Sequence, residues 1–176
     1  MLRENKLKKF GTKKATRETD LVAFLFNLNS YGKRVGAGAI EELHLNDLDY
    51  GIYSLWWTIL HMSAELIYRI NNTQPSREQY FKAQQNIKQG FKGMDMLDAA
   101  WDTLIVNRLA YSGISKANPL GGKNGSQKQL LARWSPQSLT KRITCIANMA
   151  DKITFIVRMP MVLWKKHIGT KRPKSS

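Results

Sequence analysis

The chain has 176 residues, and dividing that length between two cores would leave each half at a size where burial is marginal for stable folding. Hydrophobic residues make up 43% of the sequence, which excludes a low-hydrophobicity disordered protein and predicts one folded core. Lys and Arg number 28 against 13 Asp and Glu, and the net charge of +15 indicates a polyanionic or acidic partner. This charge favours nucleic acid, or a protein that already holds nucleic acid.

Cysteine content and the apolar segments exclude several further classes. Cys145 is the only cysteine in the sequence, so neither an intrachain disulfide nor a cysteine zinc site can form, and a reducing cell interior is expected. The basic N-terminus lacks the apolar run and the cleavage site of a signal peptide. Residues 51–70 form the longest apolar segment, but His61, Glu65 and Arg69 interrupt it too often for a membrane span. We expect a cytoplasmic protein with no membrane partner.

Positive charge is concentrated in three segments of the chain. Residues 1–17 and 158–176 each carry a net charge of +6, which predicts a basic N-terminal arm and a basic C-terminal tail around a core of residues 18–157. Residues 103–150 carry +7 and contain no acidic residue. Interleaved Lys and Arg in a foldable segment are typical of a surface that neutralises a phosphate backbone. The alternative for residues 103–150 is that their basic side chains are scattered over the solvent-exposed surface. The alternative for the basic C-terminal tail is that it is solvated and binds no partner.

The first half of the core predicts two helices and a short strand. Thr19 and Asp20 cap the first predicted helix. The alternating residues 43–45 predict a strand, and the turn-forming residues 46–49 lead from it into a helix. Apolar residues then repeat at intervals of three and four over residues 53–70, which predicts one long helix, buried on most sides, at the centre of the fold.

Helix and loop signals alternate after this long helix. Ser76 and Gln79 have the spacing of a capping box and predict a polar surface helix that runs to about Gly90. Residues 95–109 have helical apolar spacing and predict another helix. The glycine-rich residues 111–126 predict a long loop of the kind that is usually functional or disordered, and their glycines lack the spacing of a phosphate-binding P-loop.

The last predicted elements are a helix and a strand. Ser135 is a typical N-cap and Pro136 a typical first helical residue, so a helix is predicted from there through Met149. Residues 153–157 are a short apolar run that predicts a buried strand. No internal repeat is present in the sequence.

Four segments of the second half match a known family in order and spacing. They are residues 106–114, 121–124, 131–134 and 139–143. These segments closely resemble the target-recognition half of the adenine-specific DNA methyltransferases of the DNA adenine methylase type, the D12 class. The resemblance implies a helical target-recognition module at about residues 94–150.

Similarity to the same family extends toward the N-terminus. Residues 43–53 resemble the family's second strand and the helix after it, and residues 8–13 are similar to its N-terminal Pro-Gly-Gly-Lys loop. The whole resemblance spans residues 8–157 and implies an α/β, helix-rich fold. We therefore predict a remnant of a methyltransferase-like Rossmann core joined to a helical target-recognition module.

The family's cofactor site is incomplete in this sequence. In the family a strand ends in an acid-Pro-Phe-x-Gly-Gly turn, whose glycines let the backbone approach S-adenosylmethionine. Gly36 and Gly38 lie in the corresponding region, but the acid, the proline and the phenylalanine are absent. Asp47 matches the acid that approaches the cofactor's ribose, and the alternative is that Asp47 caps the following helix. We expect weak S-adenosylmethionine binding or none.

The family's catalytic motif is also absent. Its Asp-Pro-Pro-Tyr motif accepts hydrogens from the target amino group and stacks an aromatic ring on the flipped base. This sequence has no Pro-Pro pair, and none of its five prolines follows an Asp. After residue 156 the family continues to another strand and this motif, whereas this sequence passes into a basic tail. We therefore predict no methyl transfer and no enzyme activity.

Other reactive residues do not form a recognisable catalytic or metal site. His44, His61 and His167 lie far apart without the spacing of metal ligands, so no metal site is expected. We expect His61 to pack against the long helix and Cys145 to be a small core residue.

Three carboxylates share one face of the predicted helix over residues 95–109. They are Asp95, Asp98 and Asp102. This spacing suits a metal or an acid–base pair, but no fourth ligand is in sight, and a solvated acidic face is the expected role.

The sequence favours a catalytically inactive protein that binds double-stranded DNA through the recognition module. Asn suits base edges and Arg suits phosphates, and the Tyr111 ring can stack on a base or wedge between base pairs. The alternative roles of Asn107 and Tyr111 are helix capping and core packing. The predicted DNA-binding residues are Asn107, Arg108, Tyr111, Ser112, Lys116, Lys123, Lys128, Arg133, Lys141 and Arg142.

Two alternative functions remain open from the sequence. A small, strongly basic protein without catalysis could be an inhibitor from a phage or mobile element, of the anti-restriction or anti-CRISPR kind. Such an inhibitor would bind a nuclease or its ribonucleoprotein complex. The chain could also be one half of a split adenine methyltransferase whose partner supplies the catalytic motif. The DNA sequence read and the oligomeric state are not given by these patterns.

Overall fold

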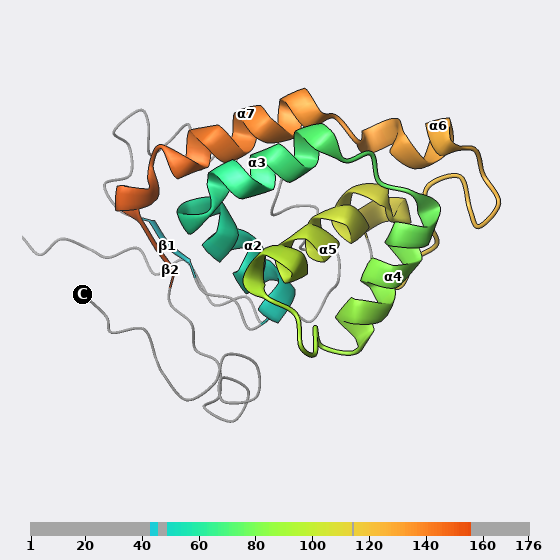
Figure 1. Ribbon diagram of the computed structural model, residues 1–176, viewed down its shortest axis with the longest axis horizontal. Coiled ribbons are helices and arrows are strands. Elements are labelled where there is room, and N and C mark those ends of the chain that lie inside the picture. Colours follow the sequence, from blue (N-terminus) through green and yellow to red (C-terminus); the bar gives the residue numbers. More distant parts are fainter. Residues whose placement is uncertain (1–42, 46–48, 114, 156–176) are drawn as a thin grey trace, which may run out of the picture.

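The computed structural model describes residues 43–45, 49–113 and 115–155, which form a layered helical body beside a small sheet (Figure 1). The helix predicted after Thr19 and Asp20 and both basic ends lie outside the described residues. The three residues that the resemblance assigns to the cofactor also lie outside them: Gly36, Gly38 and Asp47.

The two strands form a parallel pair. β1 (Leu43–Leu45) lies beside β2 (Ile153–Phe155), with His44 opposite Thr154. A parallel pair needs a crossover connection instead of a tight turn, and here the helical body connects the strands. The predicted strand at residues 43–45 is confirmed, and the strand predicted over 153–157 is present in its described part.

α5 (Met96–Leu109) lies in the middle of the helical body (Figure 1). Every residue from Ala99 to Leu109 is buried except Arg108, so neighbours cover the helix on nearly all sides. Asp95 is its N-cap, which confirms the predicted start of this helix. No helix in the part of the chain described here is long and apolar enough to cross a membrane.

α2 (Tyr50–His61) begins at an aspartate N-cap. The Asp49 carboxylate accepts a hydrogen bond of 3.0 Å from the Ile52 backbone N–H. This bond satisfies a helix N–H that has no partner within the helix. The N-cap of α2 is therefore Asp49, and Asp47, the N-cap that the sequence offered, lies outside the described residues.

The predicted long helix over residues 53–70 is wrong, because it is interrupted at Met62. The backbone there has φ −137° and ψ 39°, outside the helical region, and α3 (Ser63–Asn72) follows the break. α2 packs mainly on α5, whereas α3 packs on α7 (Pro136–Ala147). The break lets one apolar sequence serve two packing partners.

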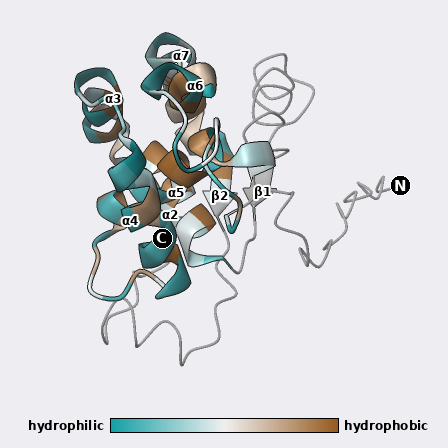
Figure 2. Cartoon of the chain, turned by 90° about the vertical axis from the view of Figure 1, so that its right-hand side faces the viewer, coloured by the Kyte–Doolittle hydropathy of each residue, from teal (hydrophilic) through white to brown (hydrophobic). Residues whose placement is uncertain are grey.

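α4 (Arg77–Lys88) begins with the predicted capping box. The Gln79 N–H donates to Ser76 Oγ at 3.1 Å, and the Ser76 N–H donates to Gln79 Oε1 at 2.9 Å. Tyr80 and Ala83 are completely buried against α5, and most other α4 residues are partly or fully exposed. The predicted surface helix is therefore confirmed, and Figure 2 shows hydrophilic residues on the outer sides of α3 and α4.

The glycine-rich loop leads into a second, unpredicted capping box. Ser126 caps α6 (Gln127–Leu130), with Gln129 as its reciprocal partner. Ser135 caps α7 and Pro136 is its first residue, as predicted. The short 3-10 helices are η1 (Tyr111–Gly113), η2 (Leu131–Arg133) and η3 (Ala150–Lys152).

Candidate nucleic-acid interface

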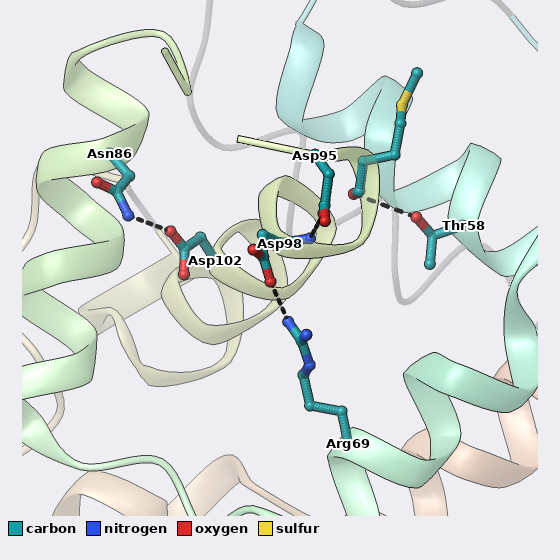
Figure 3. A network of polar contacts seen from close by, with 7 residues as sticks. Thr58, Arg69, Asn86, Asp95, Asp98 and Asp102 are labelled. Carbon is teal, nitrogen blue, oxygen red and sulfur yellow. Dashed lines mark hydrogen bonds and ion pairs between the residues drawn. The ribbon is translucent and has the colours of Figure 1, made fainter. Parts of the chain in front are cut away.

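The three aspartates of α5 have partners within the fold (Figure 3). The Asp95 carboxylate accepts from the Asp98 N–H at 2.7 Å and caps the helix. Asp98 pairs with the Arg69 guanidinium on α3 at 2.7 Å, and Asp102 accepts from the Asn86 amide on α4 at 2.7 Å. The predicted solvated acidic face is wrong for Asp102, which is buried, whereas Asp95 is exposed and Asp98 is partly exposed. Each carboxylate also joins α5 to itself or to a neighbouring helix.

Burial dominates the electrostatics of Asp102. Its side chain is 8% exposed, and this burial raises the pKa of its carboxyl, while the hydrogen bond from Asn86 opposes the rise. Among the described residues, no three His, Cys, Asp or Glu side chains lie close enough together to hold a metal ion. The acidic side of α5 therefore has a structural role.

The C-terminal end of α5 holds two arginines that donate to backbone carbonyls. The Arg108 Nε and Nη2 atoms donate to the carbonyl oxygen of Arg133 at 3.1 and 2.6 Å. In return, Arg133 Nη2 donates to the carbonyl oxygen of Ala110. These bonds tie the end of α5 to η2. They leave both positive charges without neutralisation, because a carbonyl is a neutral acceptor.

A third arginine adds to the positive field at this end. Burial lowers the pKa of Arg108, and the nearby guanidinium groups of Arg133 and Arg142 lower it further. Burial also lowers the pKa of Arg133. Residues 103–150 contain no carboxylate, so the positive charges of this segment have no acidic counterpart within it.

Two tryptophans brace η2 against α5. Trp134 meets Trp101 edge to face, with ring centroids 5.7 Å apart. The Arg69 guanidinium lies over the Trp101 ring at 5.7 Å, on the side of the acidic partners. The aromatic pair therefore lies between the acidic side and the basic end of the helix.

The recognition loop, defined here as residues 111–126, closes at its base. The Tyr111 N–H donates to the Asn118 carbonyl at 2.9 Å, and the Leu120 N–H donates to the Leu109 carbonyl at 2.7 Å. Tyr111 stands 67% exposed next to Ser112, whose φ of 54° is strained for a residue other than glycine. The alternative role of Tyr111 in core packing is wrong, because its side chain faces solvent.

The predicted lysines are all on the surface. Lys116 and Lys123 are exposed on the recognition loop, Lys128 on α6 and Lys141 on α7. Ser112 is also exposed, whereas Arg108, Arg133 and Arg142 are partly buried. The candidate interface therefore consists of exposed ammonium groups and a partly buried arginine group.

Asn107 is the predicted residue that the fold places in the interior. It is 3% exposed within α5, and its side-chain Nδ2 has no hydrogen-bond partner. In this conformation its amide cannot reach the edge of a base. We therefore leave Asn107 out of the interface defined by the exposed residues.

One other prediction about a single residue is wrong. Cys145 was expected in the core but is exposed on α7. His61 is exposed at the end of α2, and its ring lies 4.9 Å from that of Trp57 on the same helix, in line with the predicted packing against that helix.

Sequence reasoning missed three polar residues on α4 that contact the recognition loop. They are Arg77, Tyr80 and Gln84, and each donates to loop carbonyls. Their spacing of three and four residues was the available signal, because it places them on one helix face. That signal does not name the partner, which lies 31 to 49 residues further along the chain.

Comparison with known proteins identifies a family for this chain. The sequence model of the D12 class N6 adenine-specific DNA methyltransferases matches residues 23–159, which is more than three quarters of the chain. No curated protein and no solved structure matches the chain. The chain therefore belongs to the family of D12 class N6 adenine-specific DNA methyltransferases.

Proposed function

We propose that this chain binds double-stranded DNA through the basic end of α5, the recognition loop and α7, and that it transfers no methyl group by itself. The observation that carries the proposal is the composition of residues 103–150, which hold seven basic and no acidic residues. Phosphate backbones attract such a surface because binding releases condensed counterions. Membership of a DNA methyltransferase family supports DNA as the polyanion.

The proposed division of labour follows from exposure. Lys116, Lys123, Lys128 and Lys141 have exposed side chains that can meet phosphates. The exposed ring of Tyr111 offers a surface for stacking on a base or wedging between base pairs. Arg108, Arg133 and Arg142 form the partly buried positive group behind them.

The proposal that this chain transfers no methyl group rests on its sequence. It contains no Asp-Pro-Pro-Tyr motif, and the aspartates of α5 are engaged in capping and pairing contacts. The residues that resemble the S-adenosylmethionine site lie outside the described part of the chain. We propose that the cofactor binds weakly or not at all.

The proposed fold assignment is a reduced Rossmann-type core. Its support is the parallel pairing of β1 with β2 through a helical connection, an arrangement typical of α/β proteins. The strand pair is short, and the helices hold most of the hydrophobic core. In this assignment, the strand pair belongs to the reduced Rossmann-type core, and the helical module is joined to it.

Two assays on the purified chain test this function. Fluorescence anisotropy with a labelled 20-base-pair duplex should show binding that weakens steeply as salt rises. Incubation with labelled S-adenosylmethionine and an adenine-containing duplex should give no incorporation above a heat-killed control. Absence of duplex binding at low salt would contradict the first claim, and methyl incorporation would contradict the second.

The same preparation separates the other two functions. A pull-down from infected-cell lysate, with and without nuclease digestion, distinguishes binding through nucleic acid from direct binding to a nuclease. Capture of a nuclease or ribonucleoprotein that survives digestion would favour an inhibitor over a DNA-binding module. Methyl transfer that appears only when a second chain is added would favour half of a split methyltransferase.

A further inference from the structure

One face of α4 is joined to the recognition loop by a series of hydrogen bonds. Tyr80 Oη donates to the Ala117 carbonyl at 2.7 Å. Gln84 Nε2 donates to the carbonyls of Ser115 and Ala117 at 2.6 and 3.0 Å. All these acceptors are backbone oxygens of the first half of the loop.

Arg77 makes the matching contacts with the second half. Its guanidinium donates to the carbonyl of Gly122, to that of Gly125 at 2.7 Å and to that of Ser126 at 3.3 Å. The fork of an arginine can reach several carbonyls at once, which a lysine ammonium does less well. The α4 face therefore follows the loop in the opposite direction along the chain.

The glycine-rich recognition loop is closed at its base, and ordering its backbone still carries an entropic cost. Fixing a backbone conformation costs entropy, and glycine-rich segments lose the most freedom. Gly121 and Gly122 have φ of 76° and 74°, and a Cβ on Gly125 would lie 2.2 Å from the Gly121 carbonyl oxygen. The loop thus needs glycine to reach its shape and outside contacts to keep it.

α4 is able to supply those contacts because the core holds it. Tyr80 has no exposed surface, and α4 packs along α5. Burial raises the pKa of Tyr80 to about 12, so its hydroxyl stays protonated and available as a donor at any physiological pH. The donors are therefore fixed before any ligand arrives.

We infer that the Arg77, Tyr80 and Gln84 face of α4 is a positioning device, which orders the recognition loop so that DNA meets it already in its binding shape. The inference rests on the proposed DNA binding. A loop that is already ordered loses less conformational entropy when DNA binds, so its affinity for DNA is higher. The α4 side chains point their donors at carbonyls, so they act on DNA through the loop and not by direct contact.

The test compares the double variant Tyr80→Phe and Gln84→Met with the control Gln85→Met. The double variant removes the hydroxyl and amide donors to Ser115 and Ala117 and keeps side-chain size, while Gln85 is exposed on the same helix. We expect amide exchange within residues 115–126 to become faster without DNA, with α5 unchanged. Duplex affinity should fall about tenfold, and the slope of log affinity against log salt should stay at the wild-type value.

A second variant covers the case in which the double variant fails to fold. Gly122→Ala strains the loop backbone at φ 74°, and its Cβ meets no atom within 4 Å, so the core is untouched. It should reproduce the loss of affinity with an unchanged salt slope.

The outcomes separate the two proposals. A wild-type chain that binds DNA, with the double variant binding equally well or the loop exchanging no faster, overturns the positioning role alone. A lower salt slope in the double variant also overturns that role, because the number of phosphate contacts would then depend on α4. A wild-type chain that does not bind the duplex overturns both proposals.

Discussion

At the N-terminal end of α5, Asp98 and Asp102 accept hydrogen bonds from Arg69 and Asn86, and the one cation in this group is neutralised by a carboxylate. At the C-terminal end, Arg108 and Arg133 donate to backbone carbonyls of η2 and the helix end. Both sets of contacts join α5 to its neighbours. They differ in the net charge that remains on the contacting side chains.

An ion pair cancels charge, whereas a guanidinium bound to a carbonyl uses its directional donors and keeps its charge. On the acidic side of α5, the charge of Asp98 is therefore balanced by Arg69 within the fold. At the basic end, the bonds of Arg108 and Arg133 to carbonyls leave a positive field that can attract an anion. An arginine that donates to carbonyls can therefore stabilise a fold and still leave its charge available for binding.

The largest expected effect comes from a cavity in the core beside α5, the helix that carries the acidic side and the basic end. Leu104 is 1% exposed in the middle of α5, and Leu104→Ala should lower the unfolding free energy by about 2–5 kcal/mol because it leaves a cavity. Urea unfolding followed by circular dichroism measures this loss. A loss below about 1 kcal/mol would show that the two ends of α5 do not share one core.

The basic end can be tested without changing its charge. Arg108→Lys keeps the positive charge but loses the two-pronged donation to the Arg133 carbonyl. We expect the unfolding free energy to fall by about 1–2 kcal/mol while the salt dependence of DNA binding keeps its slope. An unchanged urea midpoint would mean that this donation does not join α5 to η2.

The acidic side should respond more weakly to loss of its cation. Arg69→Met removes the partner of Asp98 and the cation over Trp101, and both side chains of the ion pair are partly exposed. The expected loss in unfolding free energy is about 1 kcal/mol, with duplex affinity unchanged. A large drop in duplex affinity would place Arg69 in the DNA-binding surface and blur the comparison.

The smallest effect is a pH dependence centred on Asp102. Burial raises the pKa of this carboxyl in the folded state, so the folded state loses stability as pH rises from the ordinary value of 3.8 through the raised folded pKa. Asp102→Asn should therefore gain stability relative to the wild-type chain across that pH interval. Thermal unfolding at closely spaced pH values measures the difference, and a constant difference at all pH values would contradict the raised pKa.

Local sequence signals predicted the starts of helices well. The capping box of Ser76 with Gln79 and the pair Ser135 and Pro136 involve neighbours in the chain, so sequence spacing alone specifies them. The segment without acidic residues also follows directly from the sequence. These features need no knowledge of the tertiary structure.

The break at Met62 and the fate of the α5 aspartates depend on distant partners. No glycine or proline marks Met62, and the break reflects the packing of α3 on α7. Arg69 lies 29 residues before Asp98, and Asn86 lies 16 residues before Asp102. Helical spacing shows that the carboxylates share a face, but only the tertiary fold shows what that face meets.

The candidate interface also contains residues that the sequence identified and features that only the tertiary fold shows. Charge and residue type identified the exposed lysines and Tyr111, because long charged side chains usually remain in solvent. The burial of Asn107 fits the core-packing role that the sequence left open, since Asn107 and Arg108 occupy different sides of a nearly buried helix. The support of the recognition loop by α4 had no local signature.

Salt-dependent duplex binding by two charge-matched triple variants tests the central claim most directly. The first replaces three exposed lysines of the segment without acids by glutamine: Lys123, Lys128 and Lys141. The second replaces three exposed lysines outside that segment: Lys82, Lys88 and Lys92. Both variants lose the same charge, so net charge cannot distinguish them.

If the basic end holds phosphates, the slope of log affinity against log salt should become shallower by about 2.7 in the first variant. The second variant should keep the wild-type slope. Equal slopes in the two variants would contradict DNA binding by residues 103–150. DNA affinity would then depend on the total charge of the chain and not on the position of these lysines.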